Sequence, residues 1–169
     1  MATAWIGLGS NLNNPIEQVH NALQELQQLP ASQLVQASGL WHSKPLGPQD
    51  QPDFINAVAQ LDTQLEPLDL LDELQKLERQ HHRQKTKHWG PRTLDLDILS
   101  YADLTLDTQR LTLPHPEIAK RAFVLLPWAE LDANWFIPGL GKVKLLLQQL
   151  TAASVAEVLP LEANSAFKL

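Results

Sequence analysis

The 169-residue chain contains no cysteine. Without thiols it can form no disulfide, no thiolate metal site and no cysteine nucleophile. It also lacks an apolar run approaching the roughly 20 residues that a membrane-spanning helix requires. Residues 1–6 lack the basic segment and the long apolar core of a secretory signal peptide. These absences make the cytoplasm the expected location.

Positive charge is scarce and unevenly distributed. The chain has 13 Lys and Arg against 19 Asp and Glu, a net charge of −6. Five of the cations lie between residues 79 and 92, and no acid occurs between Glu78 and Asp95. One cationic segment in an acidic chain suits a small anionic ligand better than a nucleic-acid backbone. The length and the hydrophobic content of 44% predict a single domain over residues 1–169.

Two aspartates stand two residues apart in an apolar segment, Leu-Asp-Leu-Asp-Ile, at residues 94–98. If this segment is a strand, Asp95 and Asp97 share one face and the apolar residues share the other. Such a pair also occurs on ordinary solvated strands. Adjacent anions repel each other, however, and Mg²⁺ commonly binds one or two carboxylates together with substrate phosphates. Asp95 and Asp97 are therefore the candidate metal ligands.

The periodicity of residues 4–101 predicts an α+β fold. Strands are expected at residues 4–8, 34–41, 54–62 and 93–101, and helices from Pro15 and from Pro67 to about residue 81. Asn14 is the expected N-cap of the first helix. The order strand, helix, strand, strand, helix, strand is that of the ferredoxin-like βαββαβ sandwich. Both helices would cover one sheet face, and the other face would present Asn56, Asp95 and Asp97 to a ligand.

Residues beyond 101 predict a small hairpin and C-terminal helices. The hairpin would join residues 104–106 to 110–113, followed by a turn at Pro114-His115-Pro116. Residues 117–131 favour a helix interrupted at Pro127. Further helical segments are expected at residues 144–150 and near residues 154–159.

The run from Trp89 to Ile98, Trp-Gly-Pro-Arg-Thr-Leu-Asp-Leu-Asp-Ile, is more specific than the aspartate pair alone. It resembles the signature of the 6-hydroxymethyl-7,8-dihydropterin pyrophosphokinases of folate biosynthesis. Residues 7–12, 45–57, 110–116 and 121–127 resemble other segments of that family, in order and at the expected spacing. The resemblance implies a monomeric enzyme that transfers pyrophosphate from ATP to the pterin hydroxymethyl group and releases AMP. It also implies two Mg²⁺ ions on the two aspartates.

The resemblance implies a role for individual residues as well. Two aromatic rings, Phe54 and Phe123, would sandwich the pterin, and offset stacking favours such an arrangement. The pterin site as a whole would comprise Ser43, Leu46, Phe54, Asn56, Asp95 and Phe123. The ATP site would comprise Gln75, Glu78, Trp89, Arg92, Ile98, Arg110, Thr112, His115 and Arg121. The catalytic group would comprise Arg83, Arg92, Asp95, Asp97, His115 and Arg121.

Several of these residues also have ordinary structural interpretations. Either phenylalanine alone is most simply a core residue, and Glu78 alone is most simply part of a solvated helix face. The chain also departs from the family pattern at three positions. His82 replaces an expected glycine, His88 an expected arginine, and Lys44 a common proline. The cationic loop is one residue shorter, which places its phosphate contacts in question.

Two other functions fit parts of the pattern. A nucleotidyltransferase would use paired strand aspartates and magnesium to direct attack at the α-phosphorus, and its product would be inorganic pyrophosphate instead of AMP. An RNA-binding ferredoxin-like module would stack bases on strand aromatics. Acids on the open face would repel RNA phosphates unless metal intervened.

The sequence shows no compelling general base for the transfer reaction.

Overall fold

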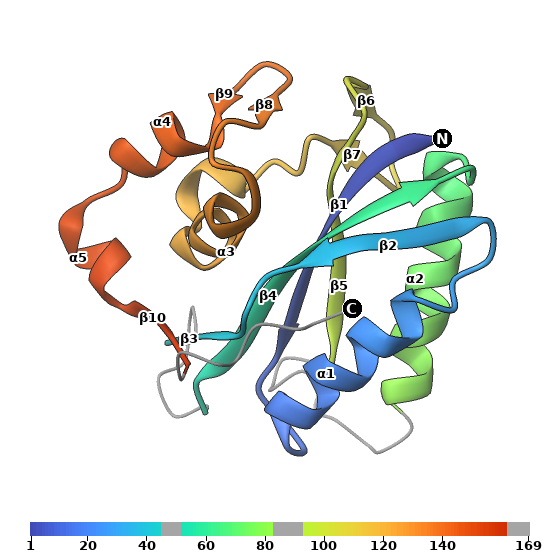
Figure 1. Ribbon diagram of the computed structural model, residues 1–169, viewed down its shortest axis with the longest axis horizontal. Coiled ribbons are helices and arrows are strands. Elements are labelled where there is room, and N and C mark those ends of the chain that lie inside the picture. The colour runs from blue at the N-terminus through green and yellow to red at the C-terminus, as the bar shows by residue number, and fades with distance from the viewer. Residues whose placement is uncertain (45–51, 83–92, 162–169) are drawn as a thin grey trace.

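The computed structural model describes residues 1–44, 52–82 and 93–161 (Figure 1). Within them, one antiparallel sheet has the strand order β10-β3-β4-β1-β5, and β2 also pairs with β4. Its strands are β1 (Ala2–Ser10), β2 (Ser32–Ala37), β3 (Trp41–Ser43), β4 (Phe54–Thr63), β5 (Asp95–Tyr101) and β10 (Val158–Pro160). Two small hairpins are formed by β6 (Leu106–Asp107) with β7 (Thr112–Leu113) and by β8 (Phe136–Ile137) with β9 (Gly141–Lys142).

Helices α1 (Pro15–Leu26) and α2 (Pro67–His81) cover one face of the sheet (Figure 1). Each buries one apolar stripe, including Leu23 of α1 and Leu74 of α2. The same core contains Ile6 and Leu8 of β1 and Leu96 of β5. Full burial of each such side chain contributes roughly 1.5–3 kcal/mol. The prediction that both helices cover one face is therefore confirmed, as is the assignment of Leu96 to the face opposite the aspartates.

The second face is covered along part of its length by the C-terminal half of the chain. Helices α3 (Ala122–Asp132) and α4 (Val143–Gln148) contribute to a second core that contains Trp5. The Trp5 ring centroid lies 5.3 Å from that of Trp128. Along β1, the residues on this face are Trp5, Gly7 and Gly9, so bulk at one end gives way to glycine at the other. Gly7 and Gly9, at the glycine end, line a cavity.

Several boundaries differ from the sequence prediction. The single strand expected over 34–41 is divided into β2 and β3, with a register shift between Leu34 and Gln36. The helical break lies at Arg121, between the 3₁₀ turn η1 (Ile118–Lys120) and α3, and Pro127 lies inside α3. Asn14 precedes α1 as predicted but has a φ of 60° and makes no side-chain cap.

The segment near residues 154–159 is only partly helical. Helix α5 (Ala152–Ala156) is capped by Thr151, whose side chain accepts from the Ser154 N–H. The chain then forms β10, which pairs with β3. The hairpin β6–β7 and the C-terminal helices were predicted, whereas β8–β9 and β10 were not. No helix in the described ranges is long and apolar enough to span a membrane.

Candidate active site

The two predicted metal ligands lie beside the glycines of β1. Asp97 pairs with Gly7 and Asp95 pairs with Gly9 in the register of β5 against β1. Both aspartates are half-buried. Because the paired positions on β1 carry no side chains, space remains over the sheet next to both carboxylates. The alternation inferred from the sequence therefore places both carboxylates on the face that bears the cavity.

A first cavity, of about 180 Å³, lies over this glycine end of the sheet. It brings together most of the residues expected for the pterin. Its lining includes Ser43, Phe54, Asn56, Asp95, Asp97, Arg121 and Phe123. Ser43 and Asn56 are 3% and 4% exposed, and the Ser43 hydroxyl donates to the Asn56 amide oxygen at 2.6 Å. The Arg121 guanidinium carbon lies 5.5 Å from the centroid of the Phe123 ring.

A second cavity, of about 330 Å³, adjoins α2, β5 and β7. It brings together six of the residues expected for ATP, namely Gln75, Glu78, Ile98, Arg110, Thr112 and His115. Asp97 lines this cavity as well as the first. Arg121, also expected for ATP, lines the first cavity, where it lies beside Phe123. Asp97 is thus the carboxylate that both cavities share.

Arg110 is held in place by α2. One of its terminal nitrogens lies 2.6 Å from an Asp72 carboxylate oxygen, and the same nitrogen donates to the Gln75 side-chain oxygen at 3.2 Å. The sequence analysis did not identify Asp72. The available signal was its spacing, because Asp72 and Gln75 are three residues apart on one helix face. Arg110 and Gln75 both line the second cavity.

His115 is half-buried against β5, and its hydrogen bonds define its tautomer. Its backbone N–H donates to the Leu99 carbonyl at 2.9 Å, and its Nδ1 accepts from the Glu117 N–H at 3.1 Å. Burial lowers the pKa of His115, and the Arg121 charge lowers it further, whereas Asp97 and Glu117 act in the opposite direction. The neutral ring therefore carries its proton on Nε2, which makes that nitrogen a donor.

Glu78 is not the solvated helix residue that it resembles in isolation. One of its carboxylate oxygens accepts from the Leu96 N–H at 2.8 Å. Gly7, Gly9 and Lys44 also line the first cavity and were not assigned to a ligand from the sequence. For the two glycines, the sequence did offer a signal: they are two residues apart, as are Asp95 and Asp97, so each pair shares one face of its strand. Leu46, Arg83, Trp89 and Arg92 lie outside the described residues.

The Asp95 and Asp97 carboxylates match the ligand preference of a hard divalent cation that also binds substrate phosphates. Among the described residues, no group of three or more His, Cys, Asp or Glu side chains could hold a metal by itself. Asp95 and Asp97 supply hard oxygen ligands at the first cavity, and Asp97 also lines the second. Magnesium typically takes one or two carboxylates and completes its coordination with substrate phosphates and water. The residues present therefore fit a magnesium site that requires a phosphorylated substrate.

An α+β sheet with helices on one face, and a carboxylate shared by two cavities on the other, is typical of an enzyme that joins two small ligands. A model of the 7,8-dihydro-6-hydroxymethylpterin-pyrophosphokinase family matches residues 5–133. The chain belongs to this family. It is accordingly a diphosphotransferase of folate biosynthesis that uses ATP as co-substrate.

Individual relatives agree with this assignment. A Haemophilus influenzae protein named 2-amino-4-hydroxy-6-hydroxymethyldihydropteridine pyrophosphokinase is 46% identical over 160 residues, which are 95% of this chain and 100% of the relative. A Pseudomonas aeruginosa protein of the same name is 51% identical over 134 residues, 79% of this chain and 83% of the relative. Among solved structures, Plasmodium falciparum HPPK-DHPS with pteroate has a TM-score of 0.70 at 13% identity. That match covers 87% of this chain and 44% of the solved chain, and it supports the fold alone.

Proposed function

We propose that the chain transfers the terminal pyrophosphoryl group of ATP to the hydroxymethyl oxygen of 6-hydroxymethyl-7,8-dihydropterin. The observation that carries this proposal is the position of Asp97, which lines both cavities. One cavity has the lining expected for a flat heteroaromatic ring, and the other has donors suited to a triphosphate. The reacting atoms of the two substrates would meet at this carboxylate.

The first cavity would hold the pterin. Phe54 and Phe123 supply ring faces, and Asn56 supplies an amide whose orientation is fixed by Ser43. A buried amide that pairs with a ligand discriminates strongly against analogues that lack the complementary group. Arg121 lies at the same cavity and offers a planar fork for phosphate oxygens entering from the second cavity.

The second cavity would hold ATP. Arg110, oriented by Asp72, would bind phosphate oxygens, and the Nε2–H of His115 would donate to them. Fixed donors of this kind stabilise the charge that develops during phosphoryl transfer without reorganising in the transition state. Arg83 and Arg92 would add further positive charge, and Trp89 would complete the nucleotide site.

Asp95 and Asp97 would hold two magnesium ions. When bound, these ions would neutralise phosphate charge and lower the pKa of the substrate hydroxyl. In the reaction, the hydroxymethyl oxygen forms a bond to the β-phosphorus. The bond from that phosphorus to the α–β bridging oxygen breaks, AMP leaves with the electron pair, and the hydroxyl proton passes to solvent. The role of the protein is mainly to position the two substrates and to balance their charge.

We also infer the ferredoxin-like arrangement. Its support is the strand order β5-β1-β4-β2, with antiparallel neighbours and two helices on one face. We further propose that residues 1–169 form one domain and that the enzyme acts as a monomer in the cytoplasm. Sedimentation analysis at micromolar concentration would test the oligomeric state.

The test of the proposed reaction is a product analysis. The protein is incubated with ATP, Mg²⁺ and the reduced pterin, and the nucleotides are separated by chromatography. AMP should appear in equal amount with the pterin pyrophosphate and should be absent when the pterin is omitted. Formation of ADP would indicate transfer of one phosphoryl group, and inorganic pyrophosphate would indicate attack at the α-phosphorus. Either result would overturn the proposal.

A further inference from the structure

The outer edge of β5 is bonded by side chains of α2. In the part of the chain that the structure describes, β5 ends the sheet and has no neighbouring strand on that side. The Leu96 N–H on this edge donates to Glu78 at 2.8 Å. His82, which directly follows α2, places its Nε2 2.8 Å from the Leu94 carbonyl oxygen, and the Leu94 N–H approaches the same nitrogen at 3.4 Å. We take the shorter contact as the hydrogen bond, and because a carbonyl oxygen can only accept, Nε2–H is its donor. Two backbone groups that would otherwise lack a strand partner are therefore satisfied.

These two backbone groups flank Asp95. In a strand, the carbonyl of one residue and the N–H two residues later point to the same edge, and a single residue of a parallel strand bonds both. Here Glu78 and His82 take that role. They are four residues apart, the spacing that places side chains on one helix face. On the opposite edge of β5, Asp95 itself pairs with Gly9 of β1. The backbone at Asp95 is therefore held from both sides.

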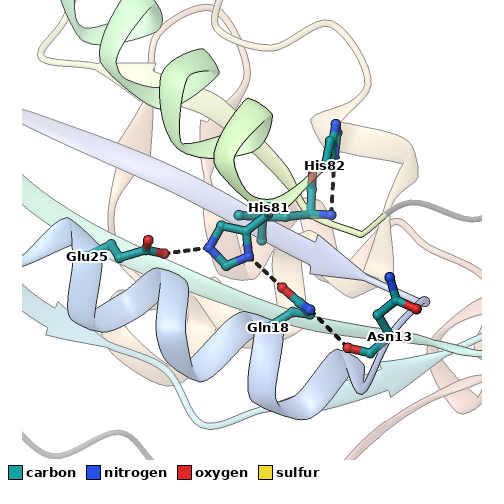
Figure 2. A network of polar contacts seen from close by, with 6 residues as sticks. Asn13, Gln18, Glu25, His81 and His82 are labelled. Carbon is teal, nitrogen blue, oxygen red and sulfur yellow. Dashed lines mark hydrogen bonds and ion pairs between the residues drawn. The ribbon is translucent and has the colours of Figure 1, made fainter. Parts of the chain in front are cut away.

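The end of α2 is itself anchored to α1 (Figure 2). The two ring nitrogens of His81 each lie 2.5 Å from an oxygen, one of Gln18 and one of Glu25. Gln18 also donates through its Nε2 to the Asn13 carbonyl at 2.9 Å, which turns its side-chain oxygen toward His81. The His81 side chain is only 8% exposed. Figure 2 shows His82 at the same helix end, so the residue that contacts β5 follows an anchored one.

We propose that Glu78 and His82 are positioning residues that fix the backbone of Asp95, and through it the Asp95 carboxylate at the first cavity. The catalytic importance of that carboxylate rests on the proposed function. In this account, Glu78 acts through Leu96 instead of through ATP. His82 stands where the family pattern has glycine, yet its φ is −90°, a conformation that does not require glycine. The His82 side chain therefore adds a support that a glycine at this position lacks.

Amide hydrogen exchange in the ligand-free protein tests the bond to Leu96. Glu78→Ala should accelerate exchange of the Leu96 amide on the order of tenfold, as expected for the loss of a hydrogen bond to a charged group. Glu78→Gln should retain most of the protection, because its amide oxygen also accepts. Glu73→Ala removes a carboxylate from the same helix and is the matched control. Unchanged Leu96 protection in Glu78→Ala, with β1 and β4 still protected, would overturn the proposal.

The contribution of His82 is read at the neighbouring peptide. His82→Ala should shift the Asp95 amide nitrogen resonance, because the Leu94 carbonyl in that peptide loses its donor. His82→Asn, which retains an N–H donor, should restore part of the shift. Gln80→Ala, on the exposed side of the same turn, serves as the control. An Asp95 resonance that is identical in all three variants and in the parent protein would contradict a positioning role for His82.

Metal binding separates positioning from direct contact with ATP. With a non-hydrolysable ATP analogue present, Mn²⁺ affinity measured by electron paramagnetic resonance should fall about tenfold in Glu78→Ala. Affinity for the analogue without metal should change less than twofold. A large loss of metal-free analogue affinity with intact Leu96 protection would show that Glu78 contacts ATP, which would overturn the proposal. The exchange experiment needs no substrate. Its result therefore tests the positioning role even if the proposed reaction proves wrong.

Discussion

The Ser43 hydroxyl donates to the amide oxygen of Asn56 at 2.6 Å, and both side chains are almost fully buried. This bond orients the amide, because the oxygen is occupied and the Nδ2 group must point elsewhere. An ideal Cβ built on Gly9 would lie 3.3 Å from that Nδ2, so the amino end of Asn56 faces the glycine end of β1. Ser43 therefore determines which hydrogen-bonding edge Asn56 presents to the first cavity.

Removing the Ser43 hydroxyl should weaken pterin binding. Ser43→Ala leaves the Asn56 oxygen without this donor and frees the amide to rotate, a loss of about 1 kcal/mol or roughly fivefold in affinity. Affinity for an ATP analogue should be unchanged, since Ser43 does not line the second cavity. Isothermal titration with each ligand measures both values, with Ser154→Ala on α5 as the control. Equal losses for both ligands would contradict the orienting role.

Adding a methyl group at Gly9 should impair the pterin site more than the same change at Gly7. The Cβ of Gly9→Ala would lie against Asn56, whose position is fixed by Ser43. The three atoms nearest to the Cβ of Gly7→Ala would all belong to the Leu99 side chain, the first at 3.2 Å, and an aliphatic side chain can shift by a few tenths of an ångström. Pterin affinity and melting temperature should be measured for both variants. Equal pterin affinities would show that Asn56 is free to move.

Truncating Phe123 should weaken pterin binding more than ATP binding. Phe123→Ala removes one stacking face, worth roughly 0.5–1.5 kcal/mol beyond area burial. It also removes the ring beside Arg121. Phe123→Leu retains apolar volume without the ring and should remain weaker than the parent protein for the pterin. Matching losses for the pterin and an ATP analogue would mean that the ring acts only in packing.

The free energy of unfolding should fall in mild acid partly because of His115. Its folded pKa lies below its ordinary value of 6.5, mainly because of burial. The unfolded chain therefore binds more protons as the pH falls below about 6.5, which favours unfolding. Urea titrations of the ligand-free protein at pH 7.5 and pH 5.5 would measure this change. His115→Gln should show a smaller decrease than the parent protein, and an identical decrease would contradict the assignment.

The sequence predicted the architecture best where one alternating pattern determined the outcome. Leu96 and Asp97 fall on opposite faces of β5, and α2 ends at His81 as predicted, because burial of one face leaves little freedom of register. The covering of the second face by α3 was not predicted. It depends on Trp5 meeting Trp128, a contact between residues 123 positions apart that no local pattern encodes.

The candidate site was likewise predictable only in part from local sequence patterns. Ser43 and Phe123 could be assigned only through the family resemblance, since a buried serine and a half-buried ring have ordinary structural interpretations. The role of Glu78 was obscured for a different reason. Its partner is a backbone N–H at Leu96, and every residue except proline carries such a group, so side-chain patterns give no sign of the contact.

Turnover of Asp97→Asn tests the central claim, that the carboxylate shared by both cavities organises the transfer. The variant retains the shape of the side chain and removes its charge. AMP release with saturating ATP, Mg²⁺ and reduced pterin should fall on the order of a thousandfold, while the melting temperature stays at or above that of the parent protein. AMP release within tenfold of the parent protein under the same conditions would contradict the account.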